Sequence, residues 1–168
     1  LHTSQLMTLN TFSDLPALKT LHLDGQFNGE VEAFSFNIQQ PLTELTHLTL
    51  RNSNISDLRQ LLKKTSGLVS LDVRGNNLSS LDGIEVLTEL ERLTLSQNPI
   101  IHFDLINQLP RLTYLAASQT GMQQIPDFHM SASLKHIDFA YNALNNLNGL
   151  ETLTKLEIAI LDSNSISD

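Results

Sequence analysis

The sequence predicts an α/β solenoid, in which a short parallel strand and a tight turn alternate along the chain. Two observations support this fold class. Leucine-type residues recur with the spacing L-x-x-L-x-L, followed by Asn and another aliphatic residue. These units start at positions 45, 68, 90, 112, 134 and 156, a period of 22 residues with one step of 23. Self-similarity at a fixed period of this length is typical of stacked-repeat proteins.

The repeat resembles that of leucine-rich repeat proteins. It is clearest in LVSLDVRGNNL (68–78), LERLTLSQNPI (90–100) and LKHIDFAYNAL (134–144), and it recurs with substitutions from 45, 112 and 156. We expect residues 1–168 to form a single domain of about seven repeats. Parallel strands would line its concave face, and short 3₁₀ or α turns would form its convex face.

The strand of each repeat follows from alternation. In the unit that starts at position 90, Leu93 and Leu95 alternate with Arg92, Thr94 and Ser96. A period of two is typical of a strand with one buried face. The leucines are therefore expected to point inward and the polar residues outward.

An Asn follows each strand at the point where the chain turns away. A buried amide there can satisfy backbone groups of its own turn and of the adjoining turn. The column that these residues form consists of Asn76, Asn98, Asn142 and Asn164, with Ser53 and Thr120 as hydroxyl substitutes.

The convex side is predicted from apolar residues at three-residue steps, a spacing that suits 3₁₀ or α turns. Two such runs are Leu78, Leu81, Ile84 and Leu87, then Ile100, Phe103, Ile106 and Leu109. Asp82-Gly83 and Asn148-Gly149 have turn composition and precede such segments. Pro126 and the stretch 130–133 predict irregular backbone after Met122.

The first repeat and the two ends depart from the pattern. The repeat that starts at Leu18 has 27 residues, with Gln26 in the Asn column and the extra residues near 35–41. We expect an outer bulge there, either as a tolerated insertion or as a partner contact. Both ends fall inside a repeat without a visible cap, so a fragment of a longer protein is expected, with a helical cap over residues 1–17 as the alternative. Bare solenoid ends favour end-to-end association.

Composition excludes several classes of function. The net charge of −8 and the absence of a Lys/Arg run argue against nucleic acid and anionic membrane surfaces as partners. No membrane span is expected, because polar residues recur every two or three positions.

The absence of cysteine excludes disulfides and thiolate metal sites. His22, Asp24 and His47 fall on adjacent strands, but too few ligands converge for a metal site. We expect no cofactor and no catalytic residues.

The repeats resemble the internalin-type class of leucine-rich repeats, in which the Asn is followed by aliphatic residues at three-residue steps. The resemblance covers nearly the whole chain. It implies the solenoid fold and a bacterial surface or secreted protein that binds a host or neighbouring protein. A cytoplasmic location is the alternative.

Partner binding is expected on the concave face. Arginine and aromatic side chains on a rigid sheet are typical of protein-binding hot spots, and exposed β-branched residues favour a covering partner. The candidates for partner binding are Arg51, Arg74, Arg92, Tyr114, His136, Tyr141, Ile158 and Ile160.

The sequence thus favours a non-catalytic protein–protein interaction module. Two alternatives stay open at this point. The chain is a structural spacer without a partner of its own, or it is a targeting domain for an enzyme or adhesin outside these 168 residues.

Overall fold

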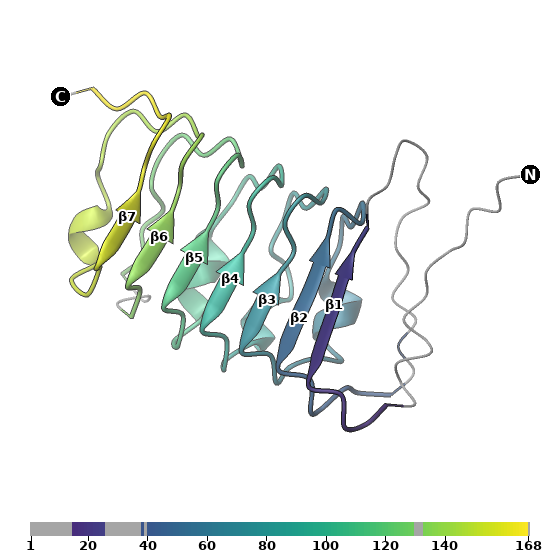
Figure 1. Ribbon diagram of the computed structural model, residues 1–168. Coiled ribbons are helices and arrows are strands. Elements are labelled where there is room, and N and C mark those ends of the chain that lie inside the picture. The colour runs from purple at the N-terminus through teal and green to yellow at the C-terminus, as the bar shows by residue number, and fades with distance from the viewer. Residues whose placement is uncertain (1–14, 26–37, 39, 130–132, 168) are drawn as a thin grey trace, which may run out of the picture.

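The computed structural model describes residues 15–25, 38, 40–129 and 133–167 (Figure 1). Seven strands form one sheet, every neighbouring pair is parallel, and the order in the sheet is the order in the chain. The strands are β1 (Thr20–Asp24), β2 (His47–Arg51), β3 (Ser70–Asp72), β4 (Arg92–Thr94), β5 (Tyr114–Ala116), β6 (His136–Asp138) and β7 (Ile158–Ile160). The predicted leucine-rich repeat solenoid is confirmed, with the strands on its concave face.

The strand register places equivalent residues of successive repeats side by side. Leu71 of β3 is paired with Leu93 of β4, which is paired with Leu115 of β5. All three side chains are buried. The leucines therefore form a continuous column through the core, as the alternation predicted, and the residues that flank them face away from it.

Short helical turns cover the convex side, behind the sheet in Figure 1. They are α1 (Arg59–Leu62), η2 (Ile84–Val86), η3 (Asp104–Gln108) and η4 (Leu150–Thr152). Gly83 and Gly149 precede η2 and η4 with φ values of 90° and 102°. That left-handed backbone favours glycine, which accounts for the predicted Asp-Gly and Asn-Gly turns.

The segment after Met122 contains no helix between residues 121 and 129, as Pro126 predicted. Phe128 is nevertheless fully buried, and its ring packs near Phe139 with 6.1 Å between centroids. The side chain of Phe128 therefore packs in the core although the turn that contains it is irregular.

The Asn column holds successive turns together. Asn98 is buried, and its amide nitrogen donates to the carbonyl oxygens of Val73 (2.9 Å) and Leu95 (2.8 Å). Its side-chain oxygen accepts a hydrogen bond from the backbone N–H of Leu78 at 3.0 Å. Asn76 and Asn142 make equivalent bonds to the turns that precede them.

Two sequence predictions, the direction of Ser96 and the bulge near residues 35–41, are not confirmed. Ser96 is only 2% exposed, so the prediction that it faces outward was wrong. The hydroxyl of Ser96 accepts a hydrogen bond from the Ser118 N–H at 3.2 Å, because the neighbouring turn covers it. The predicted bulge near 35–41 lies largely outside the described residues, as does most of the predicted cap; Ile38 itself is buried.

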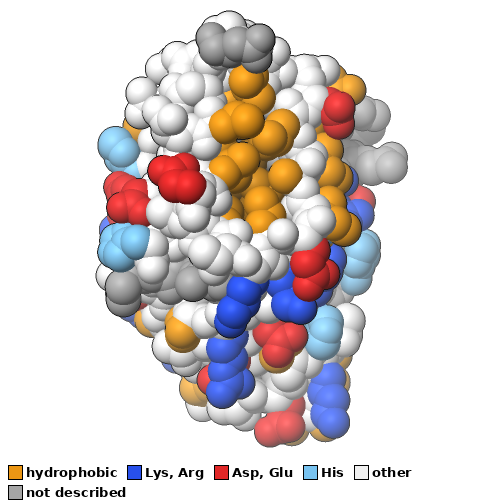
Figure 2. All heavy atoms as spheres, turned by 90° about the vertical axis from the view of Figure 1, so that its left-hand side faces the viewer, with side chains coloured by type: hydrophobic (Ala, Val, Ile, Leu, Met, Phe, Trp, Pro, Cys, Tyr) orange, Lys and Arg blue, Asp and Glu red, His pale blue; other side chains and the backbone are white. Residues whose placement is uncertain are grey.

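The C-terminal end of the sheet exposes apolar side chains, which gather on the face shown in Figure 2. Ala159 occupies the inward position of β7 but is exposed, whereas the equivalent Ile137 of β6 is buried.

Among the described residues, no helix has the length and apolar character that crossing a membrane requires.

Candidate functional site

The concave face carries one row of side chains that the register brings together. Arg92, Tyr114, His136 and Ile158 occupy equivalent positions in β4, β5, β6 and β7. We call these four residues the central row. Four of the eight predicted partner-binding residues therefore lie side by side.

The central row is stacked. The guanidinium carbon of Arg92 lies 4.0 Å from the centre of the Tyr114 ring. On the other side, the rings of Tyr114 and His136 are 4.6 Å apart between centroids and are tilted by 34°. A cation over an aromatic ring contributes about 0.5–1 kcal/mol at an exposed site. These contacts restrict the side chains of Arg92, Tyr114 and His136 on the sheet.

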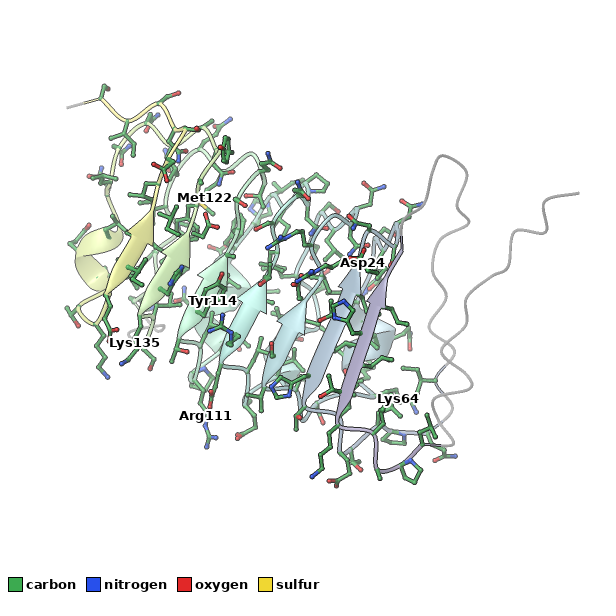
Figure 3. All side chains as sticks on the ribbon, in the orientation of Figure 1. Asp24, Lys64, Arg111, Tyr114, Met122 and Lys135 are labelled. Carbon is green, nitrogen blue, oxygen red and sulfur yellow. The ribbon has the colours of Figure 1, made fainter. Side chains whose placement is uncertain are left out.

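A shallow hollow of about 380 Å³ opens along this row. Its lining consists of the central row together with Thr113, Lys135 and Glu157. Lys135 and Glu157 form an ion pair of 2.8 Å, and this hydrogen bond raises the pKa of Lys135 above its ordinary value. Figure 3 shows Tyr114 on the open face of the sheet and Lys135 at the edge where the strands begin.

The arginine at the end of β2 is engaged within the protein. Arg51 donates two hydrogen bonds to one carboxylate oxygen of Asp72, at 2.9 and 2.6 Å, and these bonds raise the pKa of Arg51. The other oxygen of Asp72 accepts from the backbone N–H of Arg74. The side chain of Arg74 is exposed just after β3. Arg51 is thus less available to a partner than Arg74.

We expected Tyr141 on the concave face formed by the strands, but it does not lie on a strand. It follows β6 in a turn, with φ of 55°, and is 61% exposed. Gln97 and Gln119 occupy the same left-handed position in earlier repeats, and their side-chain amides are bonded at 2.7 Å. Tyr141 therefore stands at the rim where the strands end, apart from the central row.

The apolar part of the concave face is small. Ala116 at the end of β5 and Ala140 just after β6 are buried and offer little contact surface. Ile160 is half-buried, whereas Ile158 is 48% exposed. Ile158 is therefore the principal apolar contact that this part of the face offers.

The histidines near the first strands do not assemble into a metal site. The Asp24 carboxylate accepts a hydrogen bond from the Asn52 amide at 2.8 Å, and the His47 ring bonds the Thr46 hydroxyl at 3.0 Å. No group of three or more His, Asp or Glu side chains in the described ranges is placed to hold a metal ion.

A second hollow, which sequence reasoning missed, lies at the rim between residues 99–104 and 120–127 and measures about 740 Å³. Ile101, on its lining, is 71% exposed. The available signal was the pair Ile100-Ile101. Only one of these two aliphatic residues fits the inward position, so the other must face solvent.

Comparison with solved structures supports the fold. An internalin, inlF, from Listeria monocytogenes superimposes with a TM-score of 0.77 and 25% identity, over 95% of this chain and 46% of that chain. Internalin C2 from the same organism gives a TM-score of 0.77 at 19% identity, over 96% and 69% of the two chains. The latter likeness concerns the fold alone.

Sequence relatives are also repeat proteins. Nephrocan from Mus musculus is 33% identical over 115 residues, which is 66% of this chain. A homologue of a protein phosphatase 1 regulatory inhibitor subunit from Arabidopsis thaliana is 28% identical over 60% of the chain. Toll-like receptor 6 from Dasypus novemcinctus is 28% identical over 75% of it. The matched segments span 22%, 34% and 17% of these relatives' own lengths. No family model matches the chain.

Proposed function

The chain is a leucine-rich repeat protein with internalin-like repeats, and from that premise we propose that it is a non-catalytic module that binds a protein partner on its concave face. The observation that carries the proposal is the central row. Arg92, Tyr114 and His136 form one stack on a rigid sheet and are open to solvent along a hollow.

The side chains of the central row are preorganised for binding. Arginine and tyrosine dominate protein-binding hot spots because they provide a large contact area together with hydrogen-bonding groups. Side chains that are already fixed lose little entropy when a partner binds. Two relatives are named as a regulatory inhibitor subunit and as a receptor, roles that depend on a partner.

We extend the proposal to the compartment. The likeness to the Listeria internalin inlF supports a bacterial protein that is secreted or held at the cell surface. Fractionation of the source cells, followed by detection with an antibody against this chain, tests the location. Recovery in the culture medium or on intact cells is expected, and recovery in the cytoplasm alone would contradict it.

Affinity capture from extracts of the source and of candidate host cells tests the binding function. The bait is this chain, beside a variant with Tyr114→Ala, Tyr141→Ala and Ile158→Ser, both verified as folded by circular dichroism. A protein retained by the unaltered chain and lost by the variant is the expected result. Identical or empty captures would instead support the spacer or targeting alternative.

A further inference from the structure

The guanidiniums of Arg92 and Arg74 have no carboxylate partner within the described ranges of the chain, and of the two only Arg92 is stacked on an aromatic ring. Arg51, Arg59 and Arg111 are each paired with a carboxylate. Arg92 instead contacts the Tyr114 ring at 4.0 Å. A guanidinium that rests on an aromatic ring keeps its in-plane N–H donors free. The structure thus presents a positioned donor fork without a partner.

That donor fork favours one kind of acceptor. Arginine binds the planar carboxylate group through two parallel hydrogen bonds, a geometry that gives both strength and specificity. Stacking against Tyr114 fixes the side chain beforehand, so less conformational entropy is lost when the acceptor arrives. A carboxylate side chain therefore fits the position.

The surrounding charges favour a carboxylate over a phosphate. Asp138 lies two residues beyond His136 on β6, and Glu91 precedes Arg92 in the chain, whereas the charge of Glu157 in the hollow is offset by its ion pair with Lys135. The whole chain carries a net charge of −8. A phosphate group itself carries nearly two negative charges. It is therefore repelled more strongly by these carboxylates than a singly charged carboxylate is.

The other end of the central row has apolar character. Ile158 lies on the same register line as Arg92, three strands away, and is 48% exposed. Adjacent strands are about 4.8 Å apart, so the two positions are separated by roughly 14 Å. An extended segment rises about 3.3 Å per residue. Side chains at the two positions would stand about four residues apart.

We propose that the central row recognises an extended protein segment that places an acidic side chain on Arg92 and an apolar side chain on Ile158, about four residues apart. The segment crosses the strands and lies over Tyr114 and His136. This inference rests on the proposed concave-face function and specifies the chemistry of its partner.

Selection from a display library of random twelve-residue peptides tests the inference, with the 168-residue chain as bait. We expect the enriched peptides to share an Asp or Glu and an aliphatic or aromatic residue about four positions away. Arg92→Gln should weaken the binding of a selected peptide by about tenfold or more, because a charge-assisted hydrogen bond is lost. Arg59→Gln removes the same charge from α1 on the convex side and should leave the affinity unchanged.

A double-mutant cycle makes the test specific to the carboxylate. Replacing the acidic residue of the peptide with its amide should weaken binding to the unaltered chain but not to Arg92→Gln. Peptides without an acidic residue, equal losses in both backgrounds, or a library without enrichment would each overturn the inference. If the selected peptides still depend on Tyr114 or Ile158, the concave-face function stands while the acidic specificity fails. If they are insensitive to every concave substitution, both fail.

Discussion

At the scale of single residues, the Asn column connects one turn to the next. The Asn98 side chain bonds three carbonyl oxygens, that of Ser96 at the longest distance, and one N–H. Its partners Val73 and Leu78 belong to the preceding repeat. The side chain is 1% exposed, so water cannot replace it. Its amide therefore contributes to stacking as directly as the leucines do.

Replacing Asn98 with Ala should destabilise the chain strongly. The substitution leaves the Leu95 carbonyl oxygen and the Leu78 N–H without this partner, whereas the Val73 carbonyl keeps its bond from Asn76. Each unsatisfied buried group costs about 1–3 kcal/mol, so a loss of at least about 2 kcal/mol is expected. Asn77→Ala is the matched control, because Asn77 is exposed and its side-chain amide donates a hydrogen bond across the surface to Asn54. Urea unfolding followed by circular dichroism measures both. Similar losses for the two variants would contradict the structural role of the column.

The strand register gives a second prediction at this scale. Leu93→Ala and Leu115→Ala should each cost about 2–5 kcal/mol, the range for truncation of a buried leucine. Tyr114→Ala should cost about 1 kcal/mol or less, because its ring stands on the open face and loses only the stacking contacts. The same unfolding measurement applies. A large loss for Tyr114→Ala with a small one for Leu93→Ala would invert the register.

The sequence predicts the direction of most side chains but not their lateral contacts. Alternation placed Leu93 inward and Arg92 outward, because a strand has only two faces. The stack of Tyr114 on His136 depends on rotamers, and the burial of Ser96 depends on the neighbouring turn. The local sequence pattern predicts neither the stack nor this burial. Tyr141 was misplaced because a three-residue strand ended before it.

At the scale of elements, α1 begins with a local contact. The Asp57 carboxylate accepts a hydrogen bond from the backbone N–H of Arg59 at 2.8 Å and is paired with the Arg59 guanidinium at 2.6 Å. Bonding to Arg59 lowers the pKa of Asp57 below its ordinary value of 3.8. Apolar spacing predicted a turn here, but not the residue that starts it.

Asp57→Ala should destabilise the chain by about 0.5–1 kcal/mol near neutral pH, the lower range for loss of such a contact at an exposed helix start. Because the folded state lowers the pKa of Asp57, its stabilisation is present above the ordinary pKa and is lost as pH falls through the lowered value. Unfolding curves at pH 7 and pH 2 check this. A difference between variant and unaltered chain that stays constant with pH would contradict it.

At the scale of the whole molecule, stacking leaves an apolar end. Ala159 and the partly exposed Leu161 lie in β7 or just after it, and apolar side chains gather on this end in Figure 2. Strand order and period were predictable because each repeat packs only against the repeats before and after it. The structure of the first repeat was not predictable in the same way, because its 27 residues break the period.

We propose that the chain associates end to end in solution through this surface. Sedimentation velocity should show an average mass that rises with concentration, since association covers exposed apolar area. Ala159→Glu should weaken the association. Ile101→Glu, which places the same charge on an exposed apolar residue at the rim, should not. A chain that stays monomeric throughout, or equal association of both variants, would refute the proposal.

We propose that the concave face, rather than the convex face, contacts the partner. Because the chain has no cysteine, a single introduced thiol can carry a bulky polyethylene glycol maleimide at a chosen place. Thr94→Cys lies on the concave side of β4, and Glu85→Cys lies in η2 on the convex side. Binding of the captured partner or a selected peptide should be lost after labelling at position 94 and retained after labelling at position 85. Loss at position 85 with retention at position 94 would contradict the account.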